Sequence, residues 1–160
     1  MILTQKYLRE ILDYDPESGL FRWSKRRPKI VLGTVAGTLT AKGAVRILIH
    51  GRGYYAHRLV WLYVHGRWPP QQIDHIDLDR SNNRLDNLRE ASNGQNCAHR
   101  RPFGASGLKG ASRAKSGKWR ATMTVNKKAV YLGEFLTAEE AHAAYAKAAK
   151  LAHGPFARSE

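Results

Sequence analysis

The residues best suited to chemistry in this chain lie in one short window, residues 73–96, which reads IDHIDLDRSNNRLDNLREASNGQN. Asp74 and His75 are adjacent in it. A carboxylate can hold a divalent cation, and a neighbouring imidazole, with a pKa near ~6.5, can take a proton from water at neutral pH. The pair therefore suits metal-assisted hydrolysis.

The window is also unusually acidic. The chain has 160 residues and a formal net charge of +14 from 27 basic and 13 acidic side chains. Five of the acids nevertheless fall in this window: Asp74, Asp77, Asp79, Asp86 and Glu90. Such a concentration in a basic protein indicates that at least one of these acids binds a cation.

A second oxygen ligand could come from Asn96, which follows on a short helix. Carboxylate and amide oxygens, completed by water and phosphate, favour a hard ion, Mg²⁺ or alternatively Mn²⁺, over Zn²⁺. Cys97 is the only cysteine, which excludes an internal disulfide and a zinc ribbon of paired CxxC motifs. His99 is a weaker candidate for a third ligand.

Several residues of this region have plainer interpretations. Short polar side chains cap their own backbone in turns, and this interpretation is favoured for Asp77, Asp79, Ser81, Asn82 and Asn83. His57 and His65 are expected to be packing or hydrogen-bonding groups. Cys97 is expected to be a small buried residue. Asp74 and Asn87, each taken alone, would be a solvated acid and a turn residue.

The charge distribution indicates a nucleic-acid partner. Residues 1–57 carry ten basic and four acidic side chains, residues 58–103 seven and five, and residues 104–160 ten and four. Two basic flanks thus enclose a nearly neutral middle, and the most abundant cytosolic polyanions are nucleic acids. No apolar run approaches twenty residues and no leader is recognisable, so a cytoplasmic protein is expected.

The elements that must position the window are readable on both sides of it. Residues 4–12 predict a short amphipathic helix, and residues 19–23, 33–39 and 44–50 predict strands, the last joined by a turn at 50–53 to YYAH. Residues 57–68 predict a buried helix that stops at Gly66 and Pro69-Pro70. Ser92 and Gln95 form a capping-box pattern, so a helix carrying Asn96 is expected to begin there.

The C-terminal third predicts a separate module. Residues 102–107 are the best linker candidate, because they combine Pro, Gly and Ser with little to bury. Residues 119–125 and 129–135 predict a strand pair. Thr137 and Glu140 form a capping box for a helix that ends at Gly154-Pro155 and whose small-residue stripe would lie close on the sheet.

Residues 56–96 resemble the HNH endonucleases of the homing and bacteriophage type. The resemblance is carried by the Asp74-His75 pair, the NNRLDNL loop with Asn87, and Gln95-Asn96 on a capped helix. It implies a ββα-metal (His-Me finger) core in which His75 deprotonates the attacking water and Asn87 orients His75. Asp74 and Asn96 would be the metal ligands. Many members of the family have histidine at the positions of Asn96 and Arg100. Arg100 is expected to hold a phosphate instead.

Residues 106–154 resemble the DNA-binding domain of ethylene-response factors, which is also appended to phage HNH nucleases. The matching runs are GKWRA, YLGEF and TAEEAHAAY. The resemblance implies a three-stranded antiparallel sheet, packed on one helix, that enters the major groove of double-stranded DNA. Several groove-facing positions that are arginine in the plant proteins are small here, so little strict base reading is expected.

The expected DNA contacts of this module fall in two groups. Groove-facing positions are Lys109, Ser112, Ala114, Ser116, Thr122, Thr124, Ala129 and Tyr131. Phosphate contacts are Arg113, Lys115, Lys118, Arg120, Lys127 and Lys128. Trp119 and Phe135 are expected under the sheet as core aromatics rather than as base-stacking platforms.

Taken together, these observations predict an α+β protein. It has an N-terminal β-rich segment (1–55), an HNH core (56–101), a linker (102–107) and a sheet-plus-helix domain (108–160). The expected activity is metal-dependent DNA hydrolysis, nicking one strand as a monomer, without a membrane or a small-molecule cofactor. The alternatives are a DNA-binding regulator with a degenerate nuclease core and a DNA-packaging or tail-associated nuclease partner.

Overall fold

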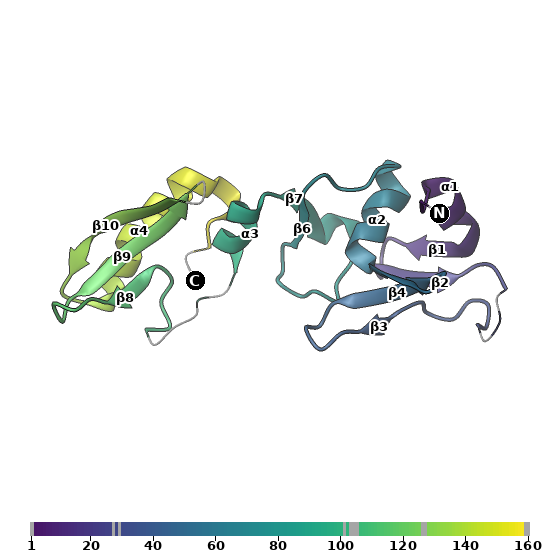
Figure 1. The fold of residues 1–160 in the computed structure, drawn as a ribbon, viewed down its shortest axis with the longest axis horizontal. Coiled ribbons are helices and arrows are strands. Elements are labelled where there is room, and N and C mark those ends of the chain that lie inside the picture. Colours follow the sequence, from purple (N-terminus) through teal and green to yellow (C-terminus); the bar gives the residue numbers. More distant parts are fainter. Residues whose placement is uncertain are drawn as a thin grey trace. The chain divides into compact units, whose positions relative to one another are not determined.

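Two compact units, residues 1–90 and 91–160, make up the chain in the computed structural model. The structure describes residues 2–26, 28, 30–100, 102, 106–125 and 128–158. Figure 1 shows small antiparallel sheets and helices in both units. The mixture is of the predicted α+β class.

Among its described residues, the first unit has two α-helices and three small sheets. The helices are α1 (Gln5–Ile11) and α2 (Ala56–His65). Figure 1 shows α1 and α2 beside strands of these sheets. A hairpin is formed by β1 (Leu12–Asp15) and β2 (Leu20–Trp23), and a three-stranded sheet by β3 (Thr38–Leu39), β4 (Val45–Ile49) and β5 (Arg52–Tyr55). The candidate site lies on β6 (Gln72–His75), the 3₁₀ turn η1 (Leu85–Asn87) and β7 (Leu88–Ala91), and β6 pairs with β7.

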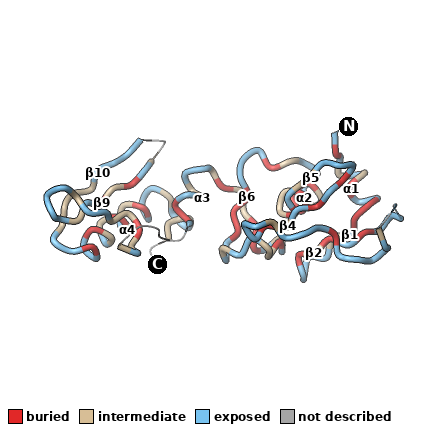
Figure 2. The backbone as a smooth tube through the Cα atoms, turned by 60° about the horizontal axis from the view of Figure 1, so that its bottom comes forward, coloured by how far each residue is buried: buried red, intermediate tan, exposed pale blue. Residues whose placement is uncertain are grey.

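One hydrophobic core joins the N-terminal segment to the predicted HNH region. Leu8 and Ile11 of α1, Ile47 of β4 and Leu59 of α2 are fully buried in it, and Ile73 beside the Asp74-His75 pair is buried with them. Figure 2 shows buried stretches along α1 and α2. Residues 1–55 are therefore not a module apart, since the strand that carries the candidate site packs on the same core.

The second unit consists of a sheet, two helices and a short turn. The helix α3 (Asn93–His99) precedes the antiparallel sheet of β8 (Ala111–Arg113), β9 (Trp119–Val125) and β10 (Lys128–Phe135). The helix α4 (Ala138–His153) and the turn η2 (Gly154–Phe156) follow. The core of this unit forms around Met123, Tyr145 and Ala149. Tyr145 lies so close to Gly110 that a Cβ added at Gly110 would clash with the Tyr145 ring.

Helix ends agree closely with the local signals. Thr4 caps α1, capping boxes form at Ser92/Gln95 and Thr137/Glu140, and Gly66 ends α2 with φ of 72°. These signals depend on neighbouring backbone groups alone, which is why sequence reveals them.

Two other predictions, of a strand and of a domain boundary, differ from the structure. The strand expected over 33–39 shortens to β3, and the chain divides between Glu90 and Ala91 rather than near residue 101. Residues 103–105 of the predicted linker, and Asn126 and Lys127 of the predicted turn, lie outside the described residues.

Candidate functional site

Asp74 lies near the end of β6, and its side chain is 5% exposed. Arg89 of β7 donates from Nε to Asp74 Oδ2 over 2.9 Å, and Nη2 lies 2.9 Å from the same oxygen as an ion pair. The guanidinium therefore compensates the buried carboxylate, which would otherwise carry a large desolvation cost. Sequence reasoning missed Arg89, because its only signal is that β6 and β7 lie side by side.

His75 ends β6 and is also buried. Burial lowers the pKa of its imidazole, while neighbouring Asn83, Asp77 and Asp74 act in the opposite direction. Burial therefore favours the neutral ring, which is the form that can accept a proton.

The His57 ring lies edge-on against His75, with centroids 5.1 Å apart and an interplanar angle of 88°. On its other side His57 stacks against Tyr55, with centroids 5.5 Å apart at 9°. His57 Nδ1 is fully buried without a hydrogen-bond partner among the described residues. His57 is thus a packing residue as predicted, but it packs against the candidate catalytic ring.

Acid should weaken the first unit through His57. Burial, then the charges of His75 and Arg58, lower the pKa of His57 from 6.5 to about 3. As the pH falls below 6.5, the His57 imidazole takes up a proton in the unfolded chain but stays neutral in the folded chain. Stability is therefore full above pH 6.5 and is lost toward pH 3, by at most about 1.4 kcal/mol per pH unit from this group.

Urea unfolding of wild type and His57→Phe between pH 7 and pH 4.5 measures this contribution. The wild type should lose stability faster than the variant, because only the wild type carries the buried imidazole. His65→Phe, at an exposed histidine, should follow the wild type. Carboxylates weaken both proteins equally below about pH 5, so equal slopes for wild type and His57→Phe would contradict the prediction.

The loop between His75 and η1 is held by Asn87. Asn87 Oδ1 accepts from Asp77 N over 3.0 Å, and its Nδ2 donates to Asp77 Oδ1 and to Asn82 O, both over 2.9 Å. Burial raises the pKa of Asp77, but the hydrogen bonds from Asn82 and Asn87 outweigh it, so the pKa is lowered. The described contacts of Asn87 thus fix the loop that follows His75, and its role in orienting His75 stays a prediction.

The turn assignment of the loop is right for Asp77 and Asp79, which accept from backbone N–H groups two residues on. Asn83 also bonds its own loop, because its Nδ2 donates to Ser81 O over 2.8 Å, but unlike an ordinary turn residue it is 1% exposed. Its side chain is buried beside His75 and raises the pKa of that ring. The run Asn82-Asn83 contains no signal that distinguishes the half-buried from the buried asparagine.

The donor chemistry of the predicted ligands fits a hard divalent cation, because the Asp74 carboxylate and the Asn96 amide both offer oxygen atoms, which such ions prefer. Arg89 already compensates part of the charge on Asp74. Within the described ranges no group of three His, Cys, Asp or Glu side chains could bind an ion. Protein ligands there would therefore be few, and water and DNA phosphate would have to complete the shell.

The remaining predicted site residues of the central window belong to the second unit. Asn96 lies on α3, and its role as a metal ligand stays a prediction. Arg100 is exposed at the end of that helix, as a phosphate contact requires. His99 is buried, whereas Cys97 is exposed, contrary to the expectation that it packs inside.

The outer face of the C-terminal sheet carries most of the predicted groove-facing residues. Residues alternate along β9, so Arg120, Thr122 and Thr124 lie opposite buried Ala121 and Met123. Their partners on β10 include Tyr131, which is 61% exposed and pairs with Thr122. Ser112 pairs with Arg120, and Arg113, Lys115, Lys118 and Lys128 are exposed. Lys127 lies outside the described residues.

Two arginines among the predicted phosphate contacts have partners within the second unit. Glu134 accepts from Arg120 Nη2 over 3.2 Å and from Ser116 over 2.7 Å, so it neutralises one predicted phosphate contact. Arg113 lies 4.6 Å above the centroid of Trp119, which shares the inner face with Ala121 but is only half-buried. Two of the predicted phosphate contacts, Arg113 and Arg120, are thus engaged with other residues of the same unit.

Lys109 is a correction. It was expected to face the DNA groove, but it is 8% exposed, and its ammonium donates to the carbonyl oxygens of Ala98 and Arg100 at the end of α3. Burial lowers the pKa of Lys109 to about 8. His142 of α4 donates through its ring to Lys109 O over 2.8 Å. Lys109 therefore attaches α3 to the sheet and α4 of the second unit.

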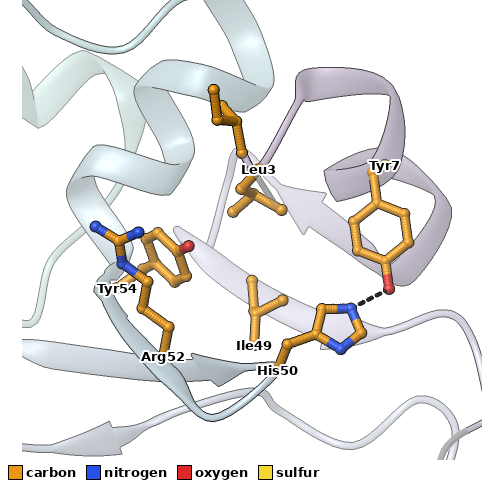
Figure 3. Close-up of a pocket in the computed structure, with 7 residues that line it drawn as sticks. Leu3, Tyr7, Ile49, His50, Arg52 and Tyr54 are labelled. Atoms are coloured by element: carbon orange, nitrogen blue, oxygen red, sulfur yellow. Dashed lines mark hydrogen bonds between the residues drawn. The ribbon is translucent and has the colours of Figure 1, made fainter.

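A separate cavity of about 280 Å³ in the first unit includes no predicted catalytic residue. Figure 3 shows Tyr7 and His50 joined by a hydrogen bond on one side of it, and Arg52 beside Tyr54 on the other. Tyr7 Oη and His50 Nε2 are 2.6 Å apart. This cavity lies outside the site under consideration.

One part of the chain is similar to a known family. Residues 54–98 match the family model described as HNH endonuclease. The match supports an HNH nuclease domain and suggests nuclease activity on DNA, that is, hydrolysis of phosphodiester bonds. No curated protein and no solved structure matches the chain. None of the described helices is both long and apolar enough to cross a bilayer.

Proposed function

We propose that the protein is a metal-dependent DNA endonuclease that nicks one strand as a monomer. The observation that carries the proposal is the buried Asp74-His75 pair at the end of β6, inside the stretch that matches HNH endonucleases. Burial gives the two groups the states that hydrolysis needs: a carboxylate compensated by Arg89 and a neutral imidazole.

In the proposed reaction His75 accepts a proton from the water that attacks phosphorus. This general-base step is typically worth about 10²–10⁴ in rate. Asn87 fixes the loop that follows His75, and His57 supports the ring from its edge. Asp74 and Asn96 would hold Mg²⁺, or Mn²⁺, which supplies stabilisation of the charge that develops on the phosphate oxygens.

The second unit would bind double-stranded DNA through the outer face of β8, β9 and β10. Its lysines and arginines would contact phosphates, and the small side chains of Ser112, Thr122 and Thr124 would face the groove. Because phosphate contacts dominate this surface, we expect affinity to fall steeply with salt and to depend weakly on sequence.

Metal removal tests the proposed activity. Supercoiled plasmid incubated with the protein and Mg²⁺ should give open-circular product, and a chelator in excess should stop the reaction. One active site per chain predicts that linear product appears only after open-circular product has accumulated.

A DNA-binding regulator is the competing outcome of the same experiment. Such a protein would retard DNA in a gel shift and never cut it, with Mg²⁺ or Mn²⁺ present. Binding without nicking over the full range of metal concentrations would refute the nuclease proposal. Nicking that persists in chelator would refute its metal dependence.

A further inference from the structure

We infer that Asn83 is the residue that positions the catalytic imidazole, by accepting a hydrogen bond from His75 Nε2–H through its Oδ1. The inference rests on the proposed function of His75 as the base. It assigns a role in the active site to a loop residue and, through that residue, to the N-terminal hairpin. The supporting observations are the unpartnered atoms around His75 and the contacts that hold Asn83.

Buried polar atoms without partners gather at His75. His75 Nε2 and Asn83 Oδ1 are both fully buried without a hydrogen-bond partner among the described residues. Buried polar atoms are rarely left in that state. The Asn83 side chain nevertheless lies close enough to act on the ring. A donor and an acceptor that lack partners and lie side by side can satisfy each other after a small rotation, as catalytic hydrogen bonds often do on substrate binding.

The amide nitrogen of Asn83 already has a hydrogen-bond partner, which fixes the direction of the amide oxygen. Asn83 Nδ2 donates to Ser81 O over 2.8 Å. With the amide nitrogen held by the loop, Oδ1 is the atom left to accept a bond. An amide oxygen can only accept, so it would bind the protonated nitrogen of a neutral imidazole.

The N-terminal hairpin holds the Asn83 backbone. Tyr14 Oη on β1 donates to Asn83 O over 2.9 Å. Burial raises the pKa of Tyr14 to about 12, so the phenol stays a donor at neutral pH. Gly19, in the turn between β1 and β2 with φ of +71°, approaches so closely that a Cβ would lie 2.7 Å from the Asn83 carbonyl carbon. The hairpin and the loop are thus packed backbone to backbone.

This arrangement selects one tautomer of His75. If Nε2–H donates to Asn83, the proton is absent from Nδ1, and Nδ1 carries the lone pair that accepts a proton from water. Of the two ring nitrogens, Nε2 is the one that is both fully buried and without a partner. Fixing the tautomer and the orientation of a general-base histidine is a known requirement of such catalysis. Asn87 is not available for this task, since its amide is engaged with Asp77 and Asn82.

The test is the ring nitrogen spectrum of His75 in the metal-free, DNA-free protein. Long-range ¹H–¹⁵N correlation at pH 8 should show the wild-type ring as a single tautomer protonated on Nε2, with His75→Ala identifying the signals. Asn83→Leu, which keeps the branched shape but removes the acceptor together with the donor to Ser81 O, should give a mixture of tautomers. The same variant should lower kcat for nicking at least about tenfold, while KM and gel-shift affinity stay unchanged.

Asn82→Leu is the matched control, because Asn82 also serves the loop, through Asp77 Oδ2 over 2.6 Å and Arg84 N over 3.3 Å. It should lower the unfolding midpoint and leave the His75 tautomer unchanged. A wild-type ring protonated on Nδ1, or an unchanged tautomer in Asn83→Leu, would overturn the inference. If the tautomer shifts but the wild type never nicks DNA, the positioning role stands and the proposed nuclease function fails.

Discussion

Replacement of His75 by alanine is expected to lower the nicking rate by about 10²–10⁴, the usual contribution of a positioned general base. In the proposed mechanism the His75 imidazole is the proton acceptor; it is buried, and burial lowers its pKa. Its loss should leave gel-shift affinity intact, because the predicted DNA contacts lie on the second unit. Single-turnover nicking of supercoiled plasmid with saturating protein measures the chemical step without interference from product release.

His65→Ala provides the comparison. His65 is exposed on α2 and contacts Trp61 rather than the candidate site. Its replacement should change the nicking rate by less than about twofold. If His75→Ala retains the wild-type rate, His75 is not the base, whereas a parallel loss in both variants would indicate that the preparation or the fold is affected.

Replacement of Asp74 should be the second large effect, and it should act on stability as well as on activity. Removing one member of a buried ion pair typically costs about 3–5 kcal/mol, because the partner charge loses its compensation. Asp74→Ala takes the carboxylate away from Arg89, whose side chain is only 20% exposed. Nicking should fall about 10²-fold or more, since a metal ligand typically contributes several kcal/mol to charge stabilisation.

A double substitution separates the two effects. Asp74→Ala with Arg89→Met removes both charges, so most of the lost stability should return in urea unfolding, while nicking stays absent. Asp74→Asn, which keeps the shape, should also lose nicking. Recovery of nicking in the double variant would show that Asp74 serves only to neutralise Arg89, and would remove it from the metal site.

The sequence determined the features of this protein that depend on near neighbours in the chain. The caps at Thr4, Ser92 and Thr137 each need only a side chain and a backbone N–H three residues on. The alternation along β9 separates buried Ala121 from the outer Thr122 without any knowledge of the partner strand. The Asp74-His75 pair and its family likeness are likewise local, and the family comparison supports that likeness over residues 54–98.

Tertiary structure alone decided which polar groups face one another, because that depends on contacts between distant segments. Arg89 reaches Asp74 only because β6 and β7 pair, and Tyr14 reaches Asn83 across 69 positions of chain. The sequence predicts that Lys109 is a surface cation, whereas in the structure its ammonium donates to the carbonyl groups that end α3. Asn82, Asn83 and Asn87 have the same side-chain chemistry, so only their surroundings in the folded protein distinguish them. Asn83 and Asn87 are buried, whereas Asn82 is half-buried.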